Sequence, residues 1–210
     1  MDFIPHLRDT LAIGVAYALG CLTAGYYLVR FKTGQDIRRF GSGNVGATNV
    51  ARRLGRTGFV LTLLGDLTKG ALAVGIADAL HTDPTVRVLA LVTVIVGHIW
   101  PVQLHFRGGK GAATFLGALL AADPAMVLVL GGLCAATLVL LRRFTLSGLA
   151  AVAMLPWVAF LMDASLDMVF GLSAAALLIL IAHRSNIREE IARVPAERRR
   201  RPGRRIASKQ

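Results

Sequence analysis

Apolar residues in this chain run in long stretches, and the polar residues gather in a few clusters between them. Hydrophobic residues make up 55% of the 210 positions, which is more apolar surface than a soluble domain of this size needs. A helix needs about 20 apolar residues to cross the hydrocarbon core of a bilayer. The pattern predicts six membrane spans, at roughly 8–30, 57–80, 85–103, 124–141, 146–163 and 166–183.

A seventh apolar run, 112–122, is shorter than a full span. It lies between Lys110 and the pair Asp123-Pro124, and it is compatible with a half-span, a tilted short helix or a re-entrant piece. We therefore expect an all-α integral membrane protein, a seven-helix transmembrane bundle with one short span.

Charge placement tests this count, because positive residues favour the cytoplasmic side of short loops. An external N-terminus and seven crossings place most basic residues inside and most aspartates outside, whereas six crossings break the pattern. The inner set is Arg30, Lys32, Arg38, Arg39, Arg52, Arg53, Arg56, Arg107, Lys110, Arg142, Arg143 and the C-terminal tail; the outer set is Asp2, Asp9, Asp83, Asp123, Asp163 and Asp167, with Arg8 and Arg87. The C-terminus is therefore expected in the cytoplasm.

The formal charge of +12 is concentrated near the C-terminus, where ten Arg or Lys and three Glu occur from position 184 onward. We expect residues 1–190 to form a single transmembrane domain and residues 191–210 to form a basic, disordered cytoplasmic tail against anionic headgroups. Nucleic-acid binding is not expected, because no aromatic residues are interleaved with this charge.

A glycine- and amide-rich segment, Gly41-Ser42-Gly43-Asn44-Val45-Gly46-Ala47-Thr48-Asn49, separates the first two spans. It is bracketed by Arg38, Arg39, Arg52 and Arg53. Backbone N–H groups, hydroxyl and amide donors and guanidinium groups together are typical of a phosphate-binding loop. The Gly41-x-Gly43-x-x-Gly46 spacing matches a dinucleotide fingerprint by letter only, because no strand precedes it. The alternative is a tight connection between two spans.

A second cluster, Gly65-Asp66-Leu67-Thr68-Lys69-Gly70, lies well inside an apolar run. Ionisable residues at membrane depth usually face a polar cavity or each other. Asp66 and Lys69 are three residues apart on one helical face, so they can pair or jointly orient a ligand. The structural alternative is a buried ion pair that fixes helix packing. In either case Asp66 is a poor general base, because Lys69 occupies it.

The third cluster begins with Gly97-His98-Ile99-Trp100-Pro101 and continues with Gly108-Gly109-Lys110-Gly111. Pro101 should end the preceding helix, and the glycines lead to the N-terminus of the next one, which predicts a second anion site. His98 and His105 lack metal-ligand spacing, so no metal is expected. His98 is interpreted as a hydrogen-bonded residue at a helix end or, alternatively, as a catalytic group.

These clusters occur together with Asp36-Ile37-Arg38 and His183-Arg184-x-Asn186-Ile187, in order along the chain. In this arrangement the chain resembles the PlsY family of bacterial glycerol-3-phosphate acyltransferases over roughly residues 10–190. The sequence departs from the family's usual pattern at Gly20-Cys21-Leu22-Thr23 and at Thr145-Leu146-Ser147-Gly148. Both departures lie outside the anion loops and leave the resemblance intact.

The resemblance implies a catalytic domain in a bacterial cytoplasmic (inner) membrane, with its active site facing the cytoplasm. It implies acyl transfer from acyl phosphate to the 1-hydroxyl of sn-glycerol 3-phosphate, giving lysophosphatidate and phosphate in an early step of phospholipid synthesis, with no cofactor. The catalytic residues that it implies are Ser42, Asn44, His183 and Asn186. The substrate-binding residues that it implies are Gly43, Gly46, Thr48, Asn49, Arg52, Asp66, Lys69, Gly108, Gly109, Lys110 and Gly111.

Three mechanisms fit these residues. A phosphate oxygen of the acyl phosphate can accept the proton of the attacking hydroxyl, and this route is favoured because no Ser-His-Asp relay is evident. His183 could instead act as a base. An acyl-enzyme on Ser42 is the least favoured route, since no base is evidently placed to activate it.

Other functions are disfavoured. A transporter of an anionic solute or lysolipid would fit broken helices and buried charges, but no inverted repeat is visible. Phosphatidyl transfer from a nucleotide-linked lipid would need clustered aspartates for a divalent metal, and the sequence contains no such cluster. A homodimer is compatible with the sequence and not required by it.

Overall fold

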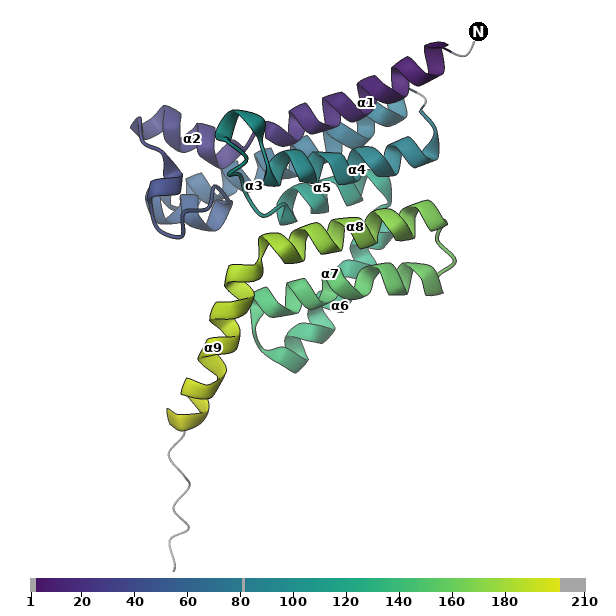
Figure 1. Cartoon of the computed structure of the whole chain (residues 1–210). Helices are drawn as coiled ribbons and strands as arrows, with labels where there is room; N and C mark the ends of the chain where they lie inside the picture. The colour runs from purple at the N-terminus through teal and green to yellow at the C-terminus, as the bar shows by residue number, and fades with distance from the viewer. Residues whose placement is uncertain (1–2, 81, 201–210) are drawn as a thin grey trace, which may run out of the picture.

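The computed structural model describes residues 3–80 and 82–200, and every regular element within them is helical. Figure 1 shows the helices running side by side, with α9 leaving the bundle. The elements in chain order are α1 (Phe3–Cys21), α2 (Ala24–Thr33), the 3-10 helix η1 (Ile37–Arg39), α3 (Ala47–Ala79), α4 (Pro84–Ile99), the 3-10 helix η2 (Val102–Leu104), α5 (Ala112–Ala122), α6 (Pro124–Leu141), α7 (Phe144–Leu161), α8 (Leu166–Ala182) and α9 (Arg184–Arg200).

Side-chain caps set several helix starts. The Asp83 carboxylate accepts a hydrogen bond of 2.8 Å from Thr85 N, and Pro84 occupies the first turn of α4. Asp123 accepts from two backbone N–H groups at the start of α6, again with a proline in the first turn. A capping carboxylate satisfies N–H groups that have no partner in the helix, and proline fits there because it lacks one.

Among the described residues, the helices α3, α6 and α7 and the segment Pro84–Leu104, which is α4 extended through η2, are long and apolar enough to cross a membrane. The number rises to six if the bent pairs α1–α2 and α8–α9 each count as one span. Helix α5 coincides with the expected short run 112–122. Several apolar, membrane-length helices are therefore present, while the count of seven crossings and the orientation of the termini stay predictions.

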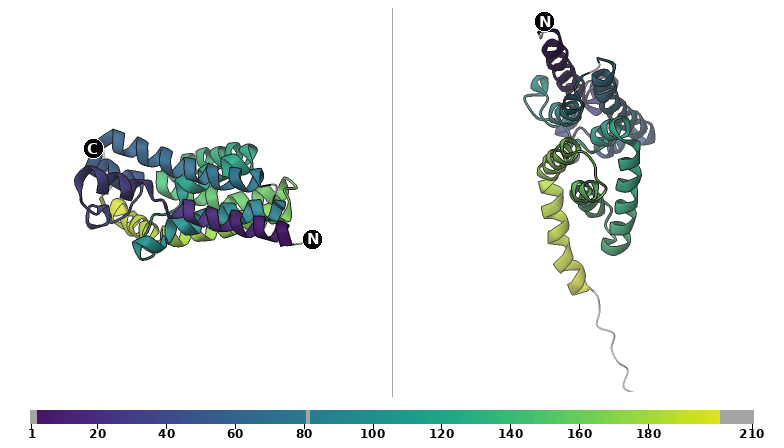
Figure 2. Two further views of the ribbon diagram at one scale, coloured as in Figure 1. Left: turned by 90° about the horizontal axis from the view of Figure 1, so that it is seen from above. Right: turned by 90° about the vertical axis from the view of Figure 1, so that its right-hand side faces the viewer.

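The bundle has two parts that meet where α4 packs on α8. In one part α1 packs on α4, and α3 packs on α5; in the other α6 packs on α7, and α7 on α8. Both further views agree with this arrangement (Figure 2). The buried core contains Leu91, Phe115, Leu155 and Ile179. Large apolar side chains also cover the outside, as Leu128 is 78% exposed, which suits contact with lipid hydrocarbon.

The first apolar run differs from a straight span. The chain breaks between α1 and α2, which meet at an angle of 42°. Helix α3 also has a kink at Gly55, whose φ of 68° a residue with a side chain rarely adopts. The N-terminal part of α3 contains the end of the glycine-rich segment, because the helix begins at Ala47.

The C-terminal region is helical further than the sequence suggested. Helix α9 is bent by 59° from α8 and continues to Arg200, across the boundary expected at residue 190. The predicted tail, 191–210, therefore begins within this helix, and its last ten residues lie outside the described residues. The division into a catalytic domain and a basic tail stays a prediction.

Candidate active site

The polar loops gather at one end of the bundle. The segment 34–46 with the start of α3, the connection 100–111 and the α8–α9 junction all lie at the end opposite the N-terminal part of α1 (Figures 1 and 2). The first and third sequence clusters and the segment around His183 and Asn186 therefore contribute to one region.

Asn49 organises the first glycine-rich loop from within α3. Its side chain is buried, and its Oδ1 accepts a hydrogen bond of 3.0 Å from Ser42 N. Its Nδ2 donates to the carbonyl oxygens of Phe40 and Asn44, both at 2.8 Å. One amide thus closes the loop on both sides, so Asn49 shapes the site instead of facing a ligand.

The other backbone N–H groups of this loop also largely donate hydrogen bonds within the loop. Gly43 N donates to Phe40 O at 3.0 Å, and Gly46 N donates to the Asn44 side chain at 2.7 Å. These N–H groups are therefore less available to an anion than the sequence suggested. The groups left at the surface are the exposed side chains of Ser42, Thr48 and Arg52 and the N-terminal turn of α3.

Arg38 joins this first loop to the second loop, the connection 100–111. Its guanidinium forms a bidentate pair with Asp36, with Nη2 to Oδ2 at 2.7 Å, and its Nη1 donates to Leu104 O at 2.8 Å. It also lies over the Tyr26 ring at 5.2 Å. The hydrogen bond from Arg38 holds the pKa of the Asp36 carboxyl below its ordinary value.

The second loop folds back on the end of α4. Gly108 N donates to Ile99 O at 3.0 Å, and Gly109 N donates to His98 O at 2.9 Å. These N–H groups complete the C-terminus of α4 and are therefore less available to an anion than the sequence suggested. Gly111 then caps α5 with a φ of 83°. The first-turn N–H groups of α5 have no acceptor within the helix and are the backbone donors of this segment left for an anion.

Lys110 links this loop to the α8–α9 junction. Its half-buried ammonium donates to the Oδ1 of Asn186. Burial lowers the pKa of Lys110 from its ordinary value, and the nearby charge of Glu189 partly opposes that shift. His183 is also half-buried, and its Nδ1 lies 2.8 Å from Ile179 O. A carbonyl only accepts, so Nδ1 carries the proton and Nε2 is left as the acceptor.

Asp66 and Lys69 lie inside the bundle, with only 3% and 5% of their surfaces exposed. Their ion pair has an Oδ1 to Nζ distance of 3.1 Å. The structure therefore does not place them with the half-buried and exposed site residues. Of the predicted site residues, Asn49, Asp66, Lys69, Gly109 and Gly111 are buried, Asn44, Gly46, Gly108, Lys110, His183 and Asn186 are half-buried, and Ser42, Gly43, Thr48 and Arg52 are exposed.

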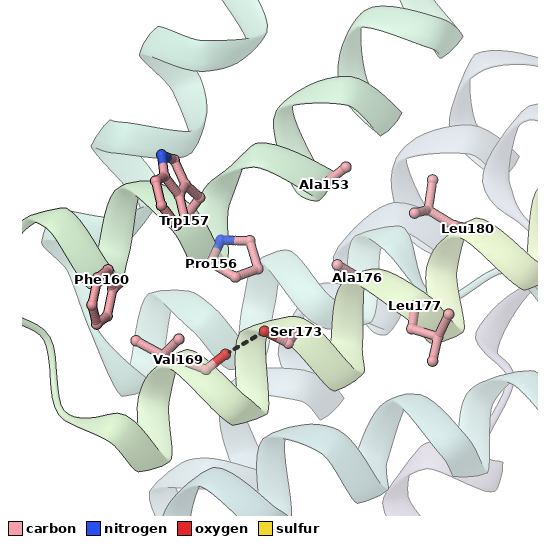
Figure 3. A pocket seen from close by; sticks show the side chains of 9 residues that line it. All are labelled: Ala153, Pro156, Trp157, Phe160, Val169, Ser173, Ala176, Leu177 and Leu180. Atoms are coloured by element: carbon pink, nitrogen blue, oxygen red, sulfur yellow. Dashed lines mark hydrogen bonds between the residues drawn. The ribbon is translucent and has the colours of Figure 1, made fainter.

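Two apolar grooves lie on the outside of the bundle. One, of about 540 Å³, runs between α7 and α8, and its polar hydroxyl, that of Ser173, already donates to Val169 O at 2.7 Å (Figure 3). The other, of about 690 Å³, lies between α2 and α3 and combines Tyr27, Phe31 and Leu61 with Arg30. The second groove adjoins the polar end, since Gln103 of η2 donates to the Tyr27 hydroxyl at 3.1 Å.

Two linking residues were not among the predicted site residues. Arg38 joins the loops, and Gln103 Nε2 donates to Cys21 O at 2.6 Å, beside the α1–α2 break. The available signal for Gln103 was a single amide with apolar neighbours, between the two parts of the third cluster. Within the part of the chain that the structure describes, no group of three or more His, Cys, Asp or Glu could hold a metal ion.

The fold and site together define a helical integral membrane protein with a cationic polar site at one end. The profile of the family described as "Glycerol-3-phosphate acyltransferase" matches residues 10–193, and the chain belongs to this family. It is 44% identical over 191 residues to "Glycerol-3-phosphate acyltransferase 1" of Desulfitobacterium hafniense (strain Y51), covering 91% of this chain and 95% of the relative. It is 40% identical over 185 residues to the glycerol-3-phosphate acyltransferase of Neisseria gonorrhoeae (strain FA 1090), covering 84% and 90%.

Two solved structures share this fold. The crystal structure of PlsY (YgiH), an integral membrane glycerol 3-phosphate acyltransferase, in its glycerol 3-phosphate form has a TM-score of 0.79 and 32% identity. The lysophosphatidic acid form of that protein has a TM-score of 0.77 and 30% identity. Each comparison covers 88% of this chain and 92% of the other. The resemblance to PlsY found in the sequence is thus confirmed.

Proposed function

We propose that this protein transfers a fatty acyl group from acyl phosphate to the 1-hydroxyl of sn-glycerol 3-phosphate, giving lysophosphatidate and inorganic phosphate. The observation that carries the proposal is the contact between Lys110 and Asn186, which joins the second loop to the α8–α9 junction at the cationic end. Family membership supports the acyltransferase, and the solved PlsY forms with glycerol 3-phosphate and lysophosphatidic acid support the acceptor and the product.

Both substrates carry a phosphate, and the site offers cations for two anions. Arg52 is exposed at the start of α3, and Lys110 is half-buried in the second loop. We assign both to phosphate binding and place Ser42 near the reacting carbonyl through its exposed hydroxyl, since its backbone N–H and those of Gly43 and Gly46 donate within the loop. The groove between α2 and α3, which carries Arg30 beside apolar side chains, is suited to an acyl chain with an anionic end.

In the favoured mechanism the substrate supplies the base. The 1-hydroxyl oxygen attacks the acyl carbonyl carbon, the bond from that carbon to the phosphate oxygen breaks, and the departing phosphate takes the hydroxyl proton. The protein positions two anions and stabilises the oxyanion. A histidine base remains the alternative, because the unprotonated Nε2 of His183 could accept that proton.

The proposal also includes the location of the site. The polar end carries Arg38, Arg52, Arg107 and Lys110, and such clusters favour the cytoplasmic side. The protein then lies in a bacterial cytoplasmic membrane with its active site inside and its N-terminus outside. The opposite placement of the N-terminal part of α1 and the loops in Figure 1 is consistent with this orientation.

Phosphate release by the purified protein in detergent, with palmitoyl phosphate and glycerol 3-phosphate, tests the activity. Release should require both substrates and be abolished by Lys110→Ala. A residual rate in His183→Ala favours the substrate-assisted route, whereas complete loss at unchanged substrate affinity favours the histidine base. Absence of release with both substrates would contradict the proposal.

A further inference from the structure

Lys69 supplies hydrogen bonds that the backbone lacks at the α1–α2 break. Its Nζ donates to the carbonyl oxygens of Gly20, at 2.9 Å, and Leu22, at 3.0 Å. Carbonyls at the end of a helix have no partner in that helix, and within a bilayer they must find one in the protein. The ammonium is balanced by Asp66, so the pair has a structural task that does not involve a ligand.

The same ammonium reaches the buried imidazole of His98 in α4. Nδ1 of His98 lies 2.8 Å from Lys69 Nζ and 3.1 Å from Thr114 Oγ1 in α5. A lysine ammonium only donates, so Nδ1 is the acceptor and the proton of the neutral ring is on Nε2. Contacts from two neighbouring helices, α3 and α5, therefore fix the rotation of this ring.

The other edge of the His98 ring lies against Gly109. A Cβ built on Gly109 would meet the Nε2 atom and would lie 2.8 Å from Cδ2, closer than real side chains approach. The backbone of Gly109 also donates to the carbonyl oxygen of His98. The ring thus occupies the space that a side chain at position 109 would need. It fixes the position of the Gly109 backbone, which directly precedes Lys110.

We propose that Asp66, Lys69 and His98 are positioning residues for Lys110, which they act on through Gly109. The proposal rests on the function proposed above, in which Lys110 binds a substrate phosphate. It gives the second and third sequence clusters one shared task and explains why a buried ion pair lies beneath a phosphate site. Loss of the His98 ring contact should therefore change substrate binding more than it changes the stability of the bundle.

A double-mutant cycle between positions 98 and 109 tests this coupling. Gly109→Ala should raise the KM for the substrate that Lys110 binds by about 10- to 100-fold, because the new methyl group displaces either the ring or the loop. His98→Asn keeps an acceptor for Lys69 but removes the ring. In the double variant the methyl group has room, so Gly109→Ala should add little to the effect of His98→Asn.

Gly132→Ala in α6 is the matched control, since a Cβ there meets nothing within 4 Å. It should leave KM, kcat and the melting temperature unchanged. Effects of Gly109→Ala that are the same with and without His98→Asn, or a Gly109→Ala variant with wild-type KM, would overturn the positioning role. If His98→Asn fails to fold, Thr114→Val replaces it, because it removes the second contact to the ring and keeps Lys69 in place, and it should raise the same KM.

The two proposals fail differently. If the wild-type protein releases no phosphate, the acyltransferase assignment fails, and the cycle is then measured as the thermal stabilisation produced by inorganic phosphate. Non-additive losses of that stabilisation in the two variants would still support positioning through Gly109. Additive losses, or equal stabilisation of the wild type and Gly109→Ala, would reject it.

Discussion

The guanidinium of Arg38 donates a hydrogen bond of 2.8 Å to the carbonyl oxygen of Leu104 and so joins the two glycine-rich loops. The same group pairs with both carboxylate oxygens of Asp36 in a bidentate arrangement. Only a planar group with several donors can hold both partners at once. The relative position of the two candidate phosphate sites therefore depends on an arginine at this position.

Replacing Arg38 by lysine should uncouple the loops while keeping the charge. The single ammonium cannot serve Asp36 and Leu104 together, so we expect turnover to fall about tenfold, with a small change in melting temperature. Steady-state phosphate release measures the effect. Arg39→Lys changes the exposed neighbour in the same way and should retain full activity. Equal rates for both variants would contradict the linking role.

Asn49→Asp should open the first loop. The substitution keeps an acceptor for Ser42 N but places an oxygen against the carbonyl oxygens of Phe40 and Asn44. We expect a loss of about 1–3 kcal/mol in the free energy of unfolding, together with lost turnover. Gln35→Glu makes the same chemical change at an exposed amide and is the control. Thermal unfolding in detergent would show the difference, and equal midpoints would refute it.

The lowered pKa of Lys110 predicts weaker substrate binding in alkali. Burial lowers this pKa in the free protein, whereas a bound phosphate favours the ammonium and raises it. Binding then takes up a proton, and affinity falls as the pH rises through the pKa of the free protein. Isothermal titration with glycerol 3-phosphate and with palmitoyl phosphate, between about pH 7 and 10, would detect this uptake for the ligand that Lys110 binds.

Lys110→Arg provides the control for that experiment, because a guanidinium stays charged throughout the range. Its affinity should vary less with pH, even if it is lower overall. A wild-type affinity that does not change with pH for either ligand would exclude Lys110 as a phosphate-binding group.

Two glycines of α3 should respond differently to alanine. A Cβ on Gly70 would lie 2.8 Å from Ala118 N in α5, whereas a Cβ on Gly75 meets nothing within 4 Å. We expect Gly70→Ala to lower the free energy of unfolding by about 1–3 kcal/mol. Gly75→Ala should change it by less than about 1 kcal/mol. A thermal unfolding series on both variants tests this, and similar stabilities would indicate that α3 and α5 can separate freely.

The ends of α5 and α6 were predictable because local signals mark them. Lys110 and Gly111 precede the apolar run of α5, and the pair Asp123-Pro124 ends it and starts the next helix through a side-chain cap. Such caps act over two or three residues, so the sequence carries them directly. The expected spans at 112–122 and 124–141 consequently match the observed helices.

The hydrogen bonds that the backbone N–H groups of the loops donate within the protein were not predictable in the same way. The glycines near Lys110 indicated an anion cradle, but Gly108 and Gly109 give their N–H groups to the last carbonyls of α4. That outcome depends on how the chain turns after Pro101, which no local pattern determines. The buried position of Asp66 was also left open, because an ion pair on one helical face fits a cavity as well as a core.

The break between α1 and α2 has a consequence for biogenesis. The carbonyl oxygens of Gly20, Cys21 and Leu22 are satisfied by side chains of Lys69 and Gln103, which lie 47 to 82 residues further along the chain. These donors have not been synthesised when the first hydrophobic segment leaves the ribosome. That segment therefore enters the bilayer before these three carbonyl oxygens have their side-chain donors. It reaches its bent form only after α3 and the end of α4 have been inserted beside it.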